Sequence, residues 1–187
     1  MSGRLFWIFT ALCVGIAVHL ATVLYGPGLA FNRKLNAVAA AQKPNHFFLM
    51  VPEAQSGFLP TSSDKDIVGL CLIDLSHGKV TVNAHVPQSF WNFTIYNTRG
   101  QQVYAINDAE AGADTFTVEV ASAKSLIEQL RGKPEADDAG KITNSGWHAE
   151  INGTSALAVM WLSVPNAAQR KMIEDEVMKT NCAGSAS

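Results

Sequence analysis

Few side chains in this sequence combine residue types and positions that suit catalysis or metal binding. Asp74, Ser76 and His77 have the residue types of a hydrolytic triad, but Ser76 lies in a turn-like Ser-His-Gly and not in the Gly-x-Ser-x-Gly elbow that exposes a nucleophile. His77, His85 and Asp108 are metal-ligand types without the spacing of a metal motif. We therefore predict no catalytic, cofactor-binding or metal-binding residues.

A surface binding loop is the remaining hypothesis for small-molecule chemistry. His85 and Tyr96 fall on outward-facing positions of expected strands, and Asn107-Asp108 follows a third strand. These four side chains could contact a ligand. The alternative is structural, because an Asn-Asp pair after a strand commonly bonds its own backbone and fixes the turn.

Aromatic residues give one more ligand hypothesis. Three tryptophans of the later chain could stack on a sugar: Trp91, Trp147 and Trp161. Trp161 stands in the apolar run ALAVMWLSV, so we expect it in the core instead.

Two cysteines lie outside the N-terminal apolar run, Cys71 and Cys182, and they form no CxxC or metal-like spacing. If the last helix packs back across the sheet, the two could reach the Cα separation of roughly 4.4–6.8 Å that a disulfide needs. A disulfide and two free thiols both stay open. The pair, with a domain poor in Lys and rich in Asn, Thr, Ser and Gln, favours an oxidising compartment.

The N-terminal region contains 21 residues without formal charge, Leu5 to Tyr25. This length suits a helix crossing a hydrocarbon core of roughly 30 Å. The hydrophobic part of a signal peptide is usually shorter, about 7–15 residues, and ends in a small-x-small cleavage site, whereas Gly26-Pro27-Gly28 follows here. We predict an uncleaved transmembrane anchor over residues 1–28, with a cleaved signal peptide as the alternative.

One face of this predicted anchor combines small and polar side chains. Gly15, His19 and Thr22 lie at spacings of four and three, which places them on one helix face. Small residues let helices approach closely, and Thr and His can form hydrogen bonds across the contact. This face either docks on a partner span or lies in lipid, with His19 reaching towards the interface.

Orientation follows from weaker signals. Arg4 precedes the span, and Arg33 and Lys34 follow it, so local charge does not favour the usual inside-first topology. Long domains, however, translocate largely regardless of charge. We predict a single-pass protein of the bacterial inner membrane with its C-terminal domain in the periplasm. The net charge is -2 and no basic patch is visible, so nucleic acid is not an expected partner.

After the anchor, Phe31, Leu35 and Val38 recur at helical spacing. We predict a juxtamembrane helix over residues 29–44, an irregular connection from Asn45 to Asp66, and one domain over residues 45–182. The small, polar residues 183–187 predict a flexible tail.

A period of two then dominates and predicts half-buried strands. The turn Asn97-Thr98-Arg99-Gly100 predicts a hairpin between two of them. The Asn152-Gly153 pair predicts a second hairpin, whose later strand is apolar on both faces and so central. The expected inward residues are Val80, Val82, Ala84 and Val86, then Trp91, Phe93 and Ile95, then Phe116, Val118 and Val120.

Two helices complete the expected domain. One begins at Ser122 with Leu126, Ile127 and Leu130 inward; the other covers 167–179, capped by Pro165-Asn166, with Met172, Ile173 and Val177 inward. The predicted fold class is therefore β-rich α+β, an antiparallel β-sandwich-like domain with two or three helices behind one transmembrane helix.

These segments resemble the bacterial domain-of-unknown-function family 1254, whose sister family is 1214. The resemblance covers about residues 45 to 180, and short members also carry one span containing a histidine, as His19 does here. Ile73 and Asn92 depart from the family pattern. The matching residues are Cys71, Asp74, Leu75, Ser76, Gly78, Phe90, Trp91, Tyr96, Gly100, Ile106, Asn107 and Asp108. The resemblance implies a β-sandwich-like domain outside the inner membrane and no established activity.

Two classes of function remain. The first is a non-enzymatic envelope protein whose domain binds another protein, such as a sister-family protein or a larger membrane complex. The second is a small-ligand or glycan-binding domain, or a hydrolase of unrecognised type. The lack of a convergent acid-base set in the sequence favours the first class.

Overall fold

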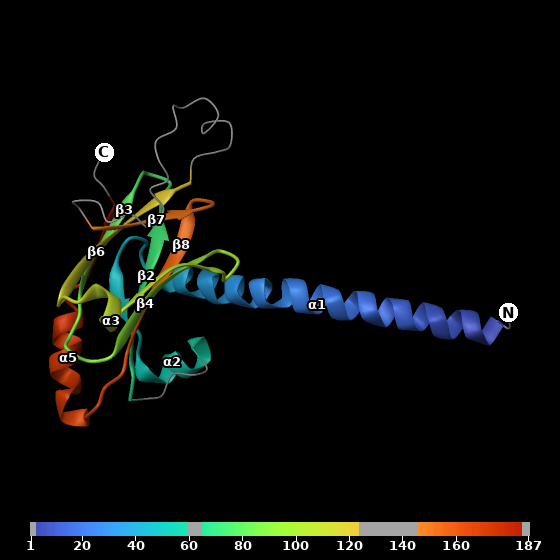
Figure 1. Ribbon diagram of the computed structural model, residues 1–187, viewed down its shortest axis with the longest axis horizontal. Helices are drawn as coiled ribbons and strands as arrows, with labels where there is room; N and C mark the ends of the chain where they lie inside the picture. The colour runs from blue at the N-terminus through green and yellow to red at the C-terminus, as the bar shows by residue number, and fades with distance from the viewer. Residues whose placement is uncertain (1–2, 60–64, 124–145, 185–187) are drawn as a thin grey trace.

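The computed structural model describes residues 3–59, 65–123 and 146–184, and two β-sheets form its domain (Figure 1). The five-stranded sheet has the order β1 (Phe47–Leu49), β2 (Ile67–Asp74), β8 (Ser155–Leu162), β4 (Trp91–Asn97) and β5 (Gln102–Asn107). The four-stranded sheet has the order β7 (Trp147–Ile151), β6 (Thr115–Ser122), β3 (Val80–His85) and β9 (Asn181–Gly184). Neighbouring strands are antiparallel except β6 and β7, which are parallel. The predicted β-rich, sandwich-like class is confirmed.

The inward faces of the two sheets make the main core. All the alternating residues predicted inward on β3, β4 and β6 are buried, together with Val86. Trp91 of β4 stacks on Phe116 of β6 with ring centroids 5.0 Å apart, so the two sheets meet through aromatic contacts. Period-two alternation therefore identified the core-facing residues of these three strands.

The five-stranded sheet is also apolar on its outer face. Val68, Leu70 and Leu72 of β2 and Leu157 and Val159 of β8 form this second cluster. Leu35 of α1 (Gly3–Ala41) lies on it, with Phe58 of α2 (Pro52–Phe58) at its margin. β8 is central, between β2 and β4, as its two apolar faces predicted.

α1 corrects one predicted boundary. The anchor predicted over residues 1–28 and the helix predicted over 29–44 are one continuous helix ending at Ala41, with Pro27 inside it. Proline removes one backbone hydrogen bond and crowds the preceding turn, which is why a break was expected. The second half of α1 packs its apolar side chains on the sheet. The free energy gained from this burial offsets the cost of the proline.

The connection predicted as irregular between Asn45 and Asp66 contains β1 and α2. β1 pairs with β2 and adds an edge strand, with Phe47 inward. α2 begins with Pro52, a residue that suits the first turn of a helix because its missing N–H is not needed there. Pro52 was thus a boundary signal rather than a sign of irregular structure.

One predicted hairpin forms and the other does not. β4 and β5 pair across the turn at Asn97–Gly100, where Gly100 has φ +77°. β7 and β8 lie in different sheets, so the chain crosses from one sheet to the other at Asn152–Thr154. The doubly apolar β8 gains most between β2 and β4, whereas β7 has one buried face and pairs with β6.

The helix predicted from Ser122 does not begin there, because β6 continues to Ser122; the rest of that prediction, residues 124–145, lies outside the described residues. The last helical region forms as η1 (Ala167–Gln169) and α5 (Arg170–Val177), with the Asn166 side chain accepting a hydrogen bond from the Ala168 N–H. Ile173 and Val177 are buried as predicted, but Met172 is 63% exposed. Part of the predicted flexible tail, Ala183–Gly184, belongs to β9.

Candidate functional site

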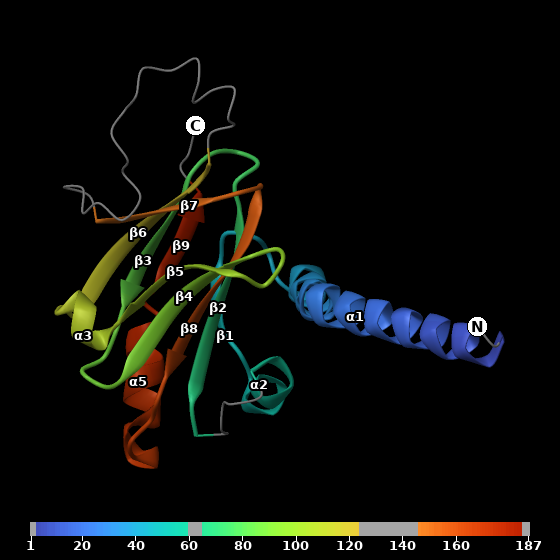
Figure 2. The same cartoon turned by 45° about the vertical axis from the view of Figure 1, so that its right-hand side comes forward.

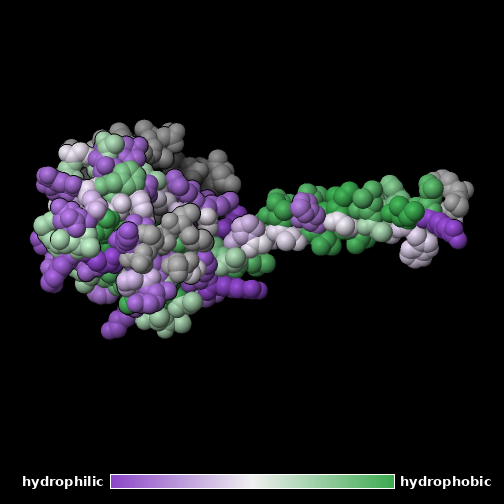
Figure 3. Space-filling model, turned by 90° about the horizontal axis from the view of Figure 1, so that it is seen from below, coloured by the Kyte–Doolittle hydropathy of each residue, from purple (hydrophilic) through white to green (hydrophobic). Residues whose placement is uncertain are grey.

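The first half of α1 lies outside the domain. Its bulky apolar residues between Leu5 and Tyr25 are 51–72% exposed, and the helix has a mean hydropathy of 2.1 over an 18-residue window. Figure 3 shows this half as a mostly hydrophobic rod attached to a domain of mixed surface. By length and composition, α1 is one candidate membrane span.

Aromatic residues mark both ends of this rod, a signal that the sequence analysis missed. Trp7 is 70% exposed and Tyr25 is 69% exposed. They are separated by about 27 Å along the helix at 1.5 Å per residue. Trp and Tyr concentrate at the two interfaces of a bilayer, and the hydrocarbon between them is roughly 30 Å thick. The pair therefore indicates how deep α1 would sit.

Gly15, His19 and Thr22 lie in this exposed half, on one face of the helix as their spacing predicted. A Cβ at Gly15 would meet nothing within 4 Å. The Thr22 hydroxyl donates to the Val18 carbonyl at 2.9 Å, so it is satisfied within the helix. No part of the described domain covers this face.

The second half of α1 is fixed to the domain by specific contacts. The rings of Phe31 and Tyr96 lie 5.8 Å apart between centroids. Lys34 Nζ donates to the Phe58 carbonyl at 3.0 Å and lies 5.8 Å from the Phe58 ring centroid. The outer face of the five-stranded sheet and α2 therefore both fix the second half of α1 to the domain.

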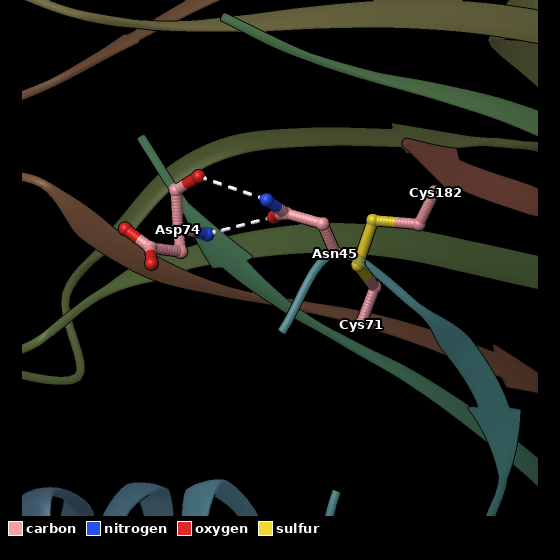
Figure 4. Close-up of a disulfide and its surroundings, with 4 residues drawn as sticks. All are labelled: Asn45, Cys71, Asp74 and Cys182. Carbon is pink, nitrogen blue, oxygen red and sulfur yellow. Dashed lines mark hydrogen bonds between the residues drawn. A yellow bond between two sulfur atoms is a disulfide. The ribbon is translucent and has the colours of Figure 1, made fainter. Parts of the chain in front are cut away.

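Asn45 completes this attachment just after the helix. It has φ 55°, a left-handed conformation that asparagine tolerates better than most residues. Its N–H donates to the Leu72 carbonyl at 2.7 Å. Its side chain donates to the Asp74 carbonyl at 3.0 Å and accepts from the Asp74 N–H at 2.8 Å (Figure 4). The chain leaving α1 is thus bonded to the end of β2.

The structure forms the disulfide that the sequence left open. Cys71 on β2 and Cys182 on β9 are joined across the sandwich, with Cα atoms 6.5 Å apart (Figure 4). α5 brings β9 back to the edge of the four-stranded sheet, which is the return that the prediction required. The bond links the two sheets close to Asn45 and hence to the base of α1.

The four residues predicted to form a binding loop lie in different surroundings. Tyr96 packs on Phe31 of α1, and His85 Nδ1 lies 3.6 Å from Glu176 Oε1 of α5. The Asn107 side chain accepts from the Glu110 N–H at 3.1 Å and caps α3 (Asp108–Ala111), which is the structural role weighed against ligand binding. Asp108 alone among them lines a hollow.

This hollow lies between the β3–β4 connection and α3, with a volume of about 360 Å³. It carries the carboxylates of Asp108 and Asp114 and the buried Ser89 Oγ, which has no hydrogen-bond partner among the described residues. Phe90, 54% exposed, stands at its margin and meets Trp161 edge-on at 5.6 Å. The complete lining is Pro87, Gln88, Ser89, Phe90, Trp91, Asp108, Gly112, Ala113 and Asp114.

The three tryptophans considered for sugar stacking are also dispersed. Trp91 is buried in the core, and Trp147 packs at the core's margin. Trp161, expected in the core, instead lies partly buried on the outer face of the five-stranded sheet. Of the three, only Trp91 lines the hollow, and its side chain is 2% exposed.

Asp74, Ser76 and His77, which have the residue types of a hydrolytic triad, form a turn instead. Asp74 Oδ1 accepts a hydrogen bond from the Ser76 N–H at 2.9 Å, and this bond, with one from the Ser76 hydroxyl, lowers the pKa of Asp74. Ser76 and His77 are exposed. Within residues 3–59, 65–123 and 146–184, no three His, Cys, Asp or Glu side chains are grouped to hold a metal ion.

Two other titrations are shifted. The hydrogen bond from Lys179 at 2.6 Å is the main cause that lowers the pKa of Glu176, and His85 contributes. Burial raises the pKa of Tyr104 to about 12, and the negative charge of Glu110 adds to the shift. Both groups lie on the domain, and neither belongs to a convergent acid-base set in the described chain.

Comparison with known proteins finds likeness in fold alone. No model of a known protein family matches the sequence, and no curated protein matches it. The structure is similar to the VPA0106 protein from Vibrio parahaemolyticus, with a TM-score of 0.60 and 13% identity over 90% of this chain and 38% of that one. It also matches an uncharacterised protein from Burkholderia cenocepacia, with a TM-score of 0.47 and 16% identity over 73% of this chain and 35% of that one. The chain thus spans 38% of the length of VPA0106, with which it shares a fold.

Proposed function

We propose that this chain is a non-enzymatic, membrane-anchored protein of the bacterial cell envelope. In this proposal α1 crosses the inner membrane once, and the domain lies in the periplasm and binds another protein as an accessory subunit of a membrane complex. We also propose membership of family 1254, with a sister-family protein as one partner. The resemblance rests on the residues from Cys71 to Asp108 quoted above.

The continuity of α1 carries this proposal. Its first half is uncovered, and its second half is fixed to the outer sheet face by Phe31, Leu35 and Lys34. A partner span that docks on the face of Gly15 and His19 would therefore stand at a set position relative to the domain. Helices in lipid associate through close packing and polar contacts, which is what small residues beside His19 offer.

The disulfide supports the proposed compartment. Such bonds persist in oxidising environments and are rare in the cytosol. A reporter that is active only outside the cytoplasm, fused after Ser187, should be active. Activity from a cytoplasmic reporter alone would refute the orientation.

The test of the interaction is a pull-down from mild detergent. Gly15→Leu with His19→Leu should release the partner while the protein stays in the membrane fraction. Cys13→Leu with Ala17→Leu is the matched control, because these residues have the same spacing and lie on the opposite helix face. Equal partner yield from both double variants would show that α1 is only a tether.

A second function, binding of a small polar ligand or glycan, is favoured by the hollow at Ser89, Asp108 and Asp114. A ligand at 100 times its Kd stabilises a protein by about 2.7 kcal/mol. A sugar or peptide library should then raise the Tm, and Asp108→Asn should abolish the rise. Asp175→Asn, an exposed carboxylate on α5, is the control.

A further inference from the structure

The β4–β5 turn lies against α1 where the helix leaves the candidate span. A Cβ at Gly28 would stand 3.4 Å from the Arg99 carbonyl oxygen, and a Cβ at Gly100 would stand 2.8 Å from Phe31. Figures 1 and 2 both show this turn reaching towards α1 on the side of the domain from which the helix projects. The turn is therefore the part of the sheet that contacts the root of the span.

The depth of this contact follows from helix geometry. Tyr25 marks the end of the uncharged run, and Gly28 is about 4.5 Å further along the axis at 1.5 Å per residue. A bilayer of 40–45 Å with a core of about 30 Å leaves roughly 5–7 Å for each headgroup layer. If α1 spans the bilayer, Gly28 and the Arg99 backbone lie within that layer.

The turn is held rigidly by its own side chains. The Asn97 side chain accepts from the N–H groups of Arg99 at 2.9 Å and Gln101 at 3.0 Å, and it donates to Gln101 Oε1 at 2.9 Å. The Gly100 N–H donates to the Asn97 carbonyl at 3.0 Å. Arg99 contributes only its backbone N–H to this network. Its side chain is exposed and can make another contact.

A second cation stands on the opposite side of the root. Arg33 is two residues after Phe31, which places it about 200° around the helix, away from the sheet. It lies roughly 12 Å beyond Tyr25, and a long arginine side chain can reach back towards the headgroups. Neither guanidinium has an acceptor among the described residues, whereas Lys79, Lys171 and Lys179 are each paired with a carboxylate.

We propose that Arg99, with Arg33 as the second cation, binds the phosphates of anionic phospholipids in the leaflet next to the domain. The inference rests on the proposed membrane anchoring and adds a lipid class and the residues that recognise it. A guanidinium presents paired donors that match a phosphate, and the rigid turn positions it before any lipid arrives. The domain is then seated on the membrane surface as well as tethered to it.

The experiment uses the full chain in a neutral detergent, titrated with phosphatidylglycerol and observed by native mass spectrometry. A basic residue near an anionic surface contributes about 1 kcal/mol, so Arg99→Gln should weaken the Kd of the first lipid adduct about fivefold. Arg33→Gln should weaken it further when combined. Lys43→Gln is the control, because this exposed lysine follows the end of α1, which lies about 24 Å beyond Tyr25.

Three outcomes would overturn the inference: equal affinity for wild type and Arg99→Gln, an equal loss for Lys43→Gln, or displacement of the lipid by millimolar inorganic phosphate. Circular dichroism should show an unchanged Tm for Arg99→Gln, because the bonds of the turn use the backbone of that residue. Carbonate extraction of native membranes tests the anchoring separately. Release of the protein there would overturn the proposed function, whereas retention with no effect of Arg99→Gln would overturn only the lipid site.

Discussion

The two halves of α1 are one helix with opposite surroundings. Bulky apolar side chains lie all around the helix between Leu5 and Tyr25 and are 51–72% exposed, whereas Phe31, Leu35 and Val38 form a single stripe that packs on the sheet. The first half needs an apolar solvent to satisfy all its faces. The second half needs one apolar partner and leaves Arg33 and Asn36 exposed.

The two halves of α1 therefore differ in what stabilises them. An all-round apolar helix is stabilised by lipid and tolerates exchange of one bulky residue for another. An amphipathic helix is stabilised by the particular surface under its stripe, so it depends on the domain being folded. Pro27 lies between the two halves, and the helix continues through it without ending.

Removal of the disulfide should have the largest effect on the free energy of unfolding of the domain. It tests whether the domain still binds the second half of α1 without this bond. Cys71→Ser with Cys182→Ser opens a link across 111 residues. The chain-entropy model gives a loss of about 4–5 kcal/mol in the free energy of unfolding, an upper figure. Urea unfolding in detergent measures it, and carbonate extraction should show the first half still in the membrane. A double variant as stable as wild type would contradict the prediction.

One substitution in each half of α1 compares their contributions to the stability of the domain directly. Leu35→Ala removes a side chain that is 5% exposed and should cost about 2–5 kcal/mol in the free energy of unfolding of the domain. Leu12→Ala, at a residue 60% exposed, should leave that free energy unchanged. Tryptophan fluorescence during urea unfolding reports both. Equal costs would mean that the two halves are not energetically distinct.

A smaller effect should follow from pushing the β4–β5 turn away from α1. Gly100→Ala combines a left-handed φ of +77° with a Cβ placed 2.8 Å from Phe31, so it should cost more than backbone strain alone, about 1–3 kcal/mol in total. Gly112→Ala has a similar φ of +60° and open space around its Cβ. The difference between the two variants in thermal unfolding isolates the contact with α1. No difference would show that the turn does not support the helix.

The smallest effect concerns pH at the place where the chain leaves α1. The pKa of Asp74 is lowered from its ordinary value of 3.8, chiefly by the Ser76 N–H. A lowered folded-state pKa stabilises the protein above the unfolded value, and this contribution is lost as pH falls through the folded value. Asp74→Asn should therefore flatten the decline in the free energy of unfolding as the pH falls below the ordinary value of 3.8. Parallel declines for variant and wild type would contradict this.

Sequence patterns predicted structure correctly where the burial or conformation of a residue depends on residues close to it in the chain. Alternation located β3, β4 and β6 with their buried faces, and Asn166 marked the start of the last helical region. The turn at Asn97–Gly100 was predictable because its chemistry is local. The apolar face of Phe31, Leu35 and Val38 was predictable for the same reason.

Partners distant in the chain were not predictable in this way. The Asn152-Gly153 pair specifies a change of direction but not which strand follows into which sheet, and β7 and β8 separate because β8 has two faces to bury. The sequence pattern placed His85 and Tyr96 on outward-facing strand positions and Asp108 after a strand. In the structure His85 lies beside α5, Tyr96 packs on α1 and Asp108 lines the hollow.

The amino-acid sequence alone was enough to predict an apolar run long enough to span a membrane, a β-rich domain behind it, and two cysteines suited to an oxidising compartment, because these features are read from composition and from the period of neighbouring residues. The fold was needed to show that Cys71 and Cys182 meet, that α1 continues through Pro27 onto the sheet, and that Arg99 lies beside Gly28. Each of these depends on burial between segments far apart in the chain, and the free energy of that burial is not encoded in any one of them.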